Sequence, residues 1–184
     1  MTTAEARTLL GQAPILHTRP NRWLELGCGT GTFTRALAEL LPPGSAITAV
    51  DRDEMALHEL PAMHNGVRIT ALNADVQDPL SGPMDGVLLA NVLHFVEDKE
   101  ALLARIAQVV PTVVLVEYDT SRPLIPWVPF PLPRNTAVPL FAKAGFVEAV
   151  LLGERPSRYG NGPLYAMAFF ARNHKSINPS NPWT

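Results

Sequence analysis

Trp23-Leu24-Glu25-Leu26-Gly27-Cys28-Gly29-Thr30-Gly31 is the stretch that decides the fold of this chain. The apolar residues of 22–26 predict a short strand, and the apolar positions of 33–41 recur at helical spacing. The three glycines between them let the backbone turn sharply and approach a ligand closely. The helix that follows directs its N-terminal amides and the positive end of its dipole at whatever occupies the turn. The stretch therefore predicts a strand, a ligand-binding turn and a helix.

The spacing of the glycines separates this turn from a dinucleotide-binding turn. It reads G-x-G-x-G, Thr32 follows directly, and the next glycine is Gly44, beyond the helix. Glu25, two residues before the first glycine, would repel a pyrophosphate and better suits a ligand with a cationic or amino-acid end. A nicotinamide-dependent oxidoreductase is therefore disfavoured.

Length and composition limit the class of protein. With 184 residues, of which 47% are hydrophobic, the chain predicts one domain over 1–175, and we expect 176–184 to be a disordered tail. A net charge of −2 indicates no broad basic surface for nucleic acid. The single cysteine, Cys28, excludes a disulfide or a zinc cluster within the chain, and no metal site is expected. Without a leader segment or an apolar run of about eighteen residues, we expect a cytoplasmic protein with no membrane association.

The order of the remaining patterns predicts a doubly wound α/β fold. Apolar runs predict strands at 22–26, 46–51, 67–72, 85–91, 113–118, 146–152 and 164–171. Helical spacing predicts helices at 3–12, 32–41, 54–60, around 102–110 and at 136–144. The last two strands have no helix-length segment between them, so they form an antiparallel hairpin at the sheet edge. Together these patterns predict a mostly parallel seven-stranded sheet with helices on both faces.

The glycine turn, the acid before it and this order of elements resemble the class I S-adenosylmethionine-dependent methyltransferases over residues 20–171. The resemblance implies that the turn contacts the methionine part of S-adenosyl-L-methionine, in part through the main chain. It implies that Asp51 accepts both ribose hydroxyls, that Asp75 accepts the adenine amino group and that Val76 touches the adenine edge. The backbone of Asn91 would contact the methionine end. The expected cofactor-binding set is Glu25, Gly27, Cys28, Gly29, Gly31, Asp51, Arg52, Asp75, Val76 and Asn91.

Three of these residues have a plain structural alternative, which for Asp75 is an ordinary loop aspartate. Asp51 could cap the following helix, although Asp53 is equally placed to do so and would leave Asp51 for the ligand. Cys28 is expected to be a small packing residue and not a nucleophile. The acids and the turn all end neighbouring strands, so they should meet in one crevice.

Candidate catalytic residues follow the fourth and fifth expected strands. His94 and Tyr118 are the candidates for a general base, with Asp119 similar to Tyr118, although a base is needed only if the acceptor must lose a proton. The alternative for His94 is a half-buried histidine that packs the next helix. Glu117 is expected to face the neighbouring helix layer or solvent.

The segment after the fifth expected strand is a candidate substrate lid. Residues 121–133 are rich in proline and carry the aromatic side chains of Trp127 and Phe130. In the family that this chain resembles, the same connection commonly covers the acceptor. The alternative is a surface loop whose aromatic residues pack on the core. The helix at 3–12 is the other expected lid.

The departures from family patterns narrow the acceptor. Asn91-Val92-Leu93-His94 stands where methyltransferases of exocyclic base amines carry N/D-P-P-Y/F, and there is no second cysteine for C5-pyrimidine chemistry. The favoured function is therefore methyl transfer to an O, N or C atom of a small organic acceptor. The alternative is a noncatalytic cofactor-binding partner or sensor of the same fold.

Overall fold

One sheet organises the part of the chain that the computed structural model describes, which is residues 1–11, 13, 19–80, 82–157 and 162–172. Its strands lie in the order β3-β4-β2-β1-β5-β6-β8-β7. They are β1 (Arg22–Leu26), β2 (Ala46–Asp51), β3 (Met63–His64), β4 (Val67–Asn73), β5 (Gly86–Ala90), β6 (Thr112–Tyr118), β7 (Phe146–Arg155) and β8 (Leu164–Ala171). The tail expected at 176–184 lies outside the described residues.

Pairing within the sheet confirms the mostly parallel arrangement and the terminal hairpin. Strands β4, β2, β1, β5 and β6 are parallel, whereas β8 runs antiparallel to both β6 and β7. The predicted number of seven strands is wrong by one, because the sheet has an eighth strand, β3, in which Met63 and His64 pair antiparallel with β4. Two residues are too few to leave a recognisable alternation, so sequence pattern could not reveal this strand.

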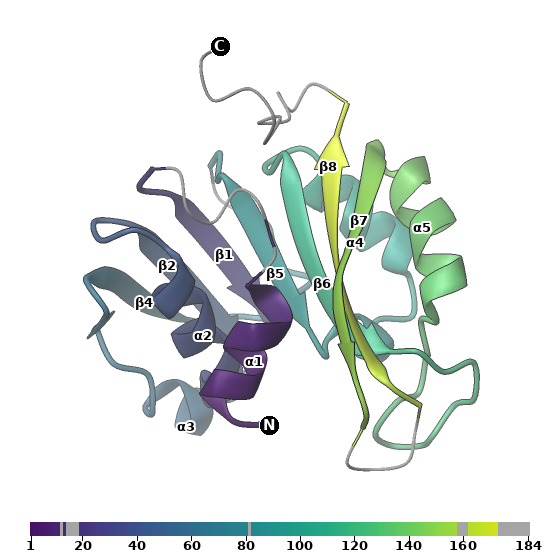
Figure 1. Cartoon of the computed structure of the whole chain (residues 1–184), viewed down its shortest axis with the longest axis horizontal. Coiled ribbons are helices and arrows are strands. Elements are labelled where there is room, and N and C mark those ends of the chain that lie inside the picture. Colours follow the sequence, from purple (N-terminus) through teal and green to yellow (C-terminus); the bar gives the residue numbers. More distant parts are fainter. Residues whose placement is uncertain (12, 14–18, 81, 158–161, 173–184) are drawn as a thin grey trace.

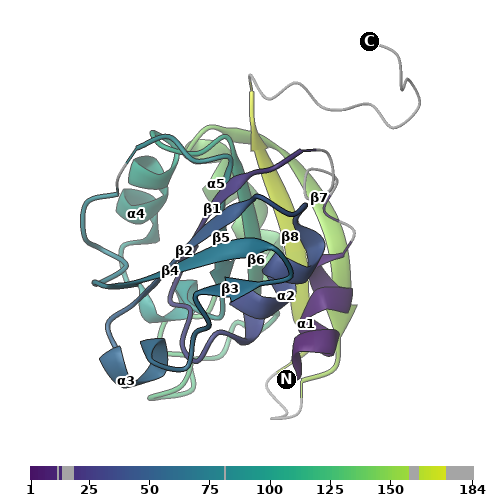
Figure 2. The ribbon, with the colours of Figure 1, turned by 90° about the vertical axis from the view of Figure 1, so that its left-hand side faces the viewer.

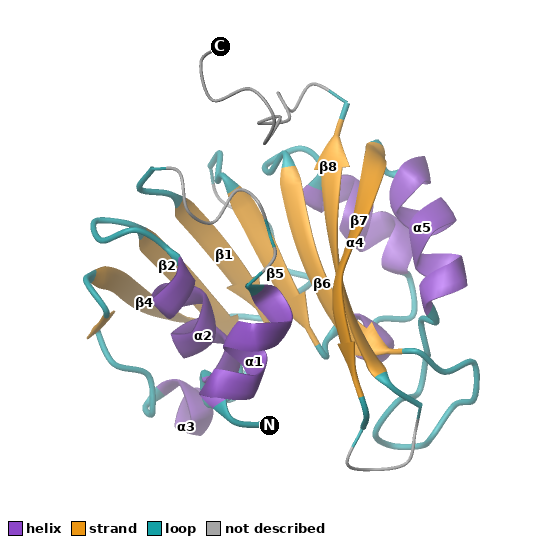
Figure 3. Ribbon diagram, in the orientation of Figure 1, coloured by secondary structure: helices purple, strands orange, loops and turns teal. Residues whose placement is uncertain are grey.

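Helices cover both faces of the sheet (Figures 1 and 2). Figure 3 shows the strands as one twisted layer, with α1 and α2 on one side and α4 and α5 on the other. None of the described helices is long and apolar enough to cross a membrane. The helical elements are α1 (Thr3–Leu10), α2 (Thr32–Leu40), α3 (Glu54–Leu57), the 3₁₀ turn η2 (Leu93–Phe95), α4 (Lys99–Ile106) and α5 (Arg134–Lys143).

Side-chain caps set where several helices begin. Thr2 and Glu5 form a reciprocal capping box at α1, Asp53 accepts from the amides of Met55 and Ala56 at α3, and Asp98 caps α4. The first helix ends at Leu10 and the third at Leu57, each earlier than expected. Because Asp53 supplies the cap of α3, the side chain of Asp51 is not needed for it.

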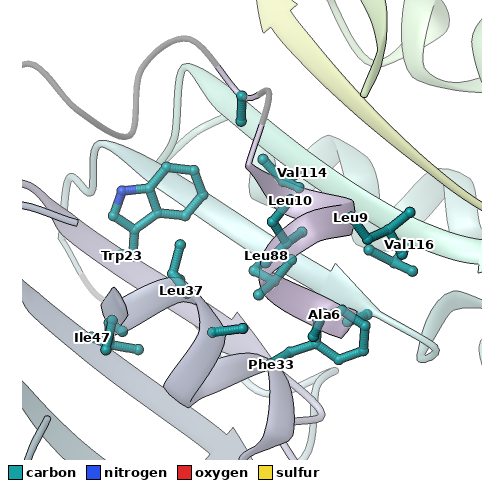
Figure 4. Close-up of a cluster of buried hydrophobic side chains, with 14 of the residues drawn as sticks. Ala6, Leu9, Leu10, Trp23, Phe33, Leu37, Ile47, Leu88, Val114 and Val116 are labelled. Atoms are coloured by element: carbon teal, nitrogen blue, oxygen red, sulfur yellow. The ribbon is translucent and has the colours of Figure 1, made fainter. Parts of the chain in front are cut away.

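Two hydrophobic clusters hold the layers together, one on each face of the sheet. On the first face, side chains of α1 and α2 meet those of the central strands, and the Trp23 indole is completely buried among them (Figure 4). A Cβ at Gly86 would lie 2.6 Å from that indole, so the neighbouring strand must carry glycine there. Burying one such large side chain contributes about 1.5–3 kcal/mol. The second cluster joins α4 and α5 to the other face.

Candidate functional site

The glycine turn is tied to the end of the neighbouring strand β2. The amides of Gly27 and Cys28 both donate to the Val50 carbonyl, at 2.8 and 3.0 Å. Gly27, Gly29 and Gly31 all have positive φ, which side chains rarely tolerate. A Cβ at Gly27 would lie 2.6 Å from Val92, and one at Gly31 would strike Leu60.

Gly29 differs from the other two glycines, because a Cβ there would meet nothing within 4 Å. Its backbone therefore faces open space. Packing alone requires glycine at 27 and 31, whereas the room beside Gly29 is available to a ligand.

A first cavity of about 330 Å³ opens beyond the carboxyl ends of β1, β2, β4 and β5. Its wall includes six of the residues that the sequence assigned to the cofactor, with Gln77, Val92, Phe95 and Val96 around them. Glu25, Cys28, Gly29 and Gly31 are not among the wall residues and lie beside or beneath it. The six are Gly27, Asp51, Arg52, Asp75, Val76 and Asn91.

The acids of this cavity are held by backbone amides. Asp51 Oδ2 accepts from the Gly29 amide at 2.7 Å, and Oδ1 accepts from the Asp53 amide at 2.9 Å. Asp75 Oδ1 accepts from the Gln77 amide at 2.9 Å. A carboxylate oxygen has two lone pairs, so each of these oxygens can accept a further hydrogen bond from a ligand hydroxyl or amine.

Glu25 and Cys28 lie inside the fold, behind the cavity. Glu25 is 1% exposed and its Oε2 has no hydrogen-bond partner among the described residues. Burial raises the pKa of Glu25 to about 8, the Thr34 hydroxyl opposes the rise and Asp51 adds to it. Burial, followed by the charges of Glu25 and Asp51, also raises the pKa of the Cys28 thiol far above its usual range. Cys28 is therefore a poor nucleophile.

Asn91 stands between the first cavity and a second one, since it lines both, as Phe95 also does. Its backbone is in the left-handed region, with φ of 55°, and its amide donates to the Val116 carbonyl at 2.8 Å. Its Oδ1 is buried and accepts no hydrogen bond from the described chain. Strain and an unpaired buried acceptor each cost about 1–3 kcal/mol, and both are characteristic of binding sites.

The second cavity, of about 660 Å³, has a mostly apolar and aromatic wall. The expected lid contributes Leu124, Trp127 and Val128, while Asn91, His94, Phe95 and Tyr118 come from the ends of β5 and β6. Trp127 is 69% exposed and Phe130 is 37% exposed, so neither aromatic residue belongs to the core. Phe130 is not among the wall residues; its ring lies 5.5 Å from the Lys99 ammonium, and its amide donates to the His94 carbonyl at 2.9 Å.

His94, on the wall of this second cavity, is paired with the buried Glu117. Glu117 Oε1 accepts from the His94 backbone amide at 3.2 Å, and Oε2 lies 2.6 Å from His94 Nδ1. Because a carboxylate oxygen can only accept, we assign the Nδ1–H tautomer, in which His94 donates to Glu117. That tautomer leaves Nε2 as the nitrogen able to accept a proton from a ligand.

Glu117 is a functional candidate that sequence reasoning missed. It lies on the same face of β6 as Val113 and Leu115, the face that α4 and α5 cover. The expectation that Glu117 faces the neighbouring helix layer is therefore confirmed. Glu117 is completely buried, so the solvent-facing alternative is wrong. An acid within an otherwise continuous apolar strand was the available signal, because such a residue needs a partner.

Two further candidates have other roles in the structure. Asp119 Oδ1 accepts from the Arg134 amide at 2.9 Å, where α5 begins, so it serves that helix. Helix α1 buries Ala6, Leu9 and Leu10 in the first hydrophobic cluster and contacts α2 and β7. None of its residues is among the walls given for the two cavities.

Comparisons with known proteins agree with the fold described above. The sequence profile of a family described as a methyltransferase domain matches residues 24–111. No curated protein sequence matches the chain. Among solved structures, the N-terminal domain of EvdMO1 with S-adenosylhomocysteine (SAH) bound is 26% identical, with a TM-score of 0.67, 92% of this chain covered and 81% of that one. The chain covers 41% of full-length EvdMO1.

Two more distant structures share the fold. Magnesium protoporphyrin IX methyltransferase from Synechocystis PCC 6803, with S-adenosylmethionine (SAM) bound, is 18% identical, with 92% and 77% of the two chains covered and a TM-score of 0.68. The mitomycin 7-O-methyltransferase MmcR is 19% identical, with 92% and 54% covered and a TM-score of 0.66.

Proposed function

We propose that this chain is a class I S-adenosylmethionine-dependent methyltransferase and that it transfers the methyl group of SAM to a small organic acceptor. The observation that carries the proposal is the contact between the two cavities. They share Asn91 and Phe95, one has Gly27 of the glycine turn and the acids Asp51 and Asp75 on its wall, and the other has His94. A cofactor in the first cavity and an acceptor in the second would therefore meet at Asn91.

The residues of the first cavity fit SAM. The open space beside Gly29 admits a ligand against the turn. The unpaired Oδ1 of Asn91 can accept a hydrogen bond from an ammonium group. Asp51 and Asp75 keep lone pairs for ribose hydroxyls and an adenine amine. When bound, SAM supplies a methyl carbon activated by its sulfonium.

In such a reaction the protein aligns the acceptor with the methyl group, excludes water from both and accepts a proton from the acceptor. Displacement at a methyl carbon requires near-attack alignment, which two adjoining cavities provide. The segment around Trp127 and Val128 covers the second cavity and would limit water there. We assign His94 as the general base, with Glu117 as a positioning residue that fixes its ring and tautomer.

Cofactor binding is the first test. SAM or SAH at about 100 times its dissociation constant should stabilise the fold by about 2.7 kcal/mol, which raises the melting temperature by about 5–10 °C. A shift with NAD and none with SAM or SAH would contradict the proposal.

Methyl transfer separates the enzyme from the alternative, a noncatalytic cofactor-binding partner or sensor. Protein supplied with methyl-labelled SAM and a small-molecule extract should produce labelled small molecules. A protein that binds SAH and labels nothing in extracts of the source cells would favour the alternative.

A further inference from the structure

The wall of the second cavity limits what the acceptor can be. Apart from His94 and Asn91, its described lining is apolar or aromatic, and no Lys, Arg, Asp or Glu stands on it. The ammonium of Lys99, which is not among the wall residues, donates to the Val96 carbonyl at 2.7 Å and lies over the Phe130 ring. Glu117, behind His94, already brings one carboxylate to this region.

These features disfavour a charged acceptor. A carboxylate on the ligand would lose its hydration without gaining a cation on the wall, and burying an unpaired charge is expensive. Phe95, Tyr118 and Trp127 instead offer aromatic surface to a flat apolar molecule. The cavity therefore selects for an uncharged ring compound.

The His94–Glu117 pair limits the acceptor atom. A neutral amine already has a free lone pair and can attack a methyl carbon without prior loss of a proton. A hydroxyl is a weak nucleophile until its proton is removed, so it benefits from a base whose tautomer is fixed. The buried contact between Nδ1 and Glu117 fixes that tautomer, so on this residue of the cavity wall Nε2 is the nitrogen that can accept a proton.

We propose that the second cavity binds an uncharged, flat, apolar compound that carries a hydroxyl group, and that this hydroxyl oxygen receives the methyl group. The inference rests on the function proposed above. The hydroxyl proton passes to His94 Nε2, and the oxygen lone pair forms the new bond to the methyl carbon. The bond between that carbon and the cofactor sulfur breaks, its electron pair stays on sulfur, and SAH is the second product.

Three compounds that share one ring system test both the charge of the acceptor and the identity of the acceptor atom. They are 1-naphthol, 1-naphthylamine and 1-naphthoate. Calorimetry on the SAH-loaded full chain should show that the two uncharged compounds bind at least about tenfold more tightly than the naphthoate. With SAM, the naphthol should be methylated faster than the naphthylamine, because only the hydroxyl makes use of the base. Binding of the naphthoate as tightly as the naphthol, no binding of the naphthol at about 1 mM, or methylation of the naphthylamine alone would each overturn the inference.

A matched pair of variants locates the binding. Trp127→Ala should weaken naphthol binding by about tenfold, because the indole is part of the wall. Ile125→Ala removes an equally exposed side chain from the same turn that is not among the wall residues, and should leave naphthol binding unchanged. Equal effects of the two variants would place the ligand elsewhere.

The same experiments distinguish the two proposals. SAH binding, measured first in the wild type and in both variants, should be unaffected by either change. Loss of the naphthol preference with SAH binding intact refutes the acceptor class alone. Absence of SAH binding in the wild type refutes the proposed function itself.

Discussion

Glu25→Gln measures what the buried carboxyl beneath the glycine turn does to stability. Glu25 is completely buried in β1, its Oε2 is unpaired, and burial raises its pKa from 4.5 to about 8. A raised pKa means that the folded state holds its proton more tightly than the unfolded state does. This group should therefore make the protein less stable as the pH rises.

The pKa values of Glu25 in the unfolded and folded states set the pH range over which it changes stability. Below about pH 4.5 the carboxyl is protonated in both states and has no effect. Between about 4.5 and 8 only the unfolded state ionises, so the free energy of unfolding falls by about 1.4 kcal/mol per pH unit. Above about pH 8 both states are ionised and the loss stays constant, at up to about 5 kcal/mol.

Urea unfolding of both proteins between about pH 5 and pH 8 gives the decisive comparison. The stability of Glu25→Gln relative to the parent should rise steadily across this range. Any fixed cost of burying the Gln amide is the same at every pH and does not affect the slope. Glu148→Gln, at an exposed position of β7, is the control and should show no such slope. Parallel pH curves for parent and Glu25→Gln would refute the reasoning.

Three predictions concern the cofactor and the base. Asp51→Ala should weaken SAH binding by about 1–3 kcal/mol in calorimetry. Asp53→Asn changes a nearby acid that caps α3 and should leave SAH binding unchanged. Equal losses in the two variants would show that Asp51 does not bind the cofactor. Gly29→Val should weaken SAH binding further, by filling the open space beside the turn. His94→Gln should lower kcat by about 10²–10⁴-fold with SAH affinity kept, and Tyr118→Phe should not; the reverse result would make Tyr118 the base.

Local pattern predicted the parts of the site that lie on one short segment. The glycines at 27, 29 and 31 signal positive φ by their residue type, and all three have it. Strand alternation correctly placed the ends of β1 and β2, and hence Asp51 at the edge of the sheet. The short strand β3 escaped notice because its two residues carry no periodicity.

The second cavity depends on which strands become neighbours. Strands β5 and β6 pair in a register that sets Ala90, the last residue of β5, beside Val116, so the chain leaves β5 at the level of Glu117 and Tyr118, the last two residues of β6. Only this register brings His94 to Glu117, 23 residues away. No local signal in 112–118 states which residue the buried acid will meet.

The sequence by itself determined the fold class, the glycine turn and the order of the acids around it, because these follow from backbone preferences and hydrophobic period within a few residues. Tertiary structure alone decided that Glu117 is buried against His94 and that Asn91 Oδ1 is unpaired between two cavities. It also decided that Trp127 stays exposed on the cavity wall and does not join the core. Burial and pairing are properties of contacts between distant segments, and a hydrophobic pattern specifies the face of a strand without specifying what packs against it.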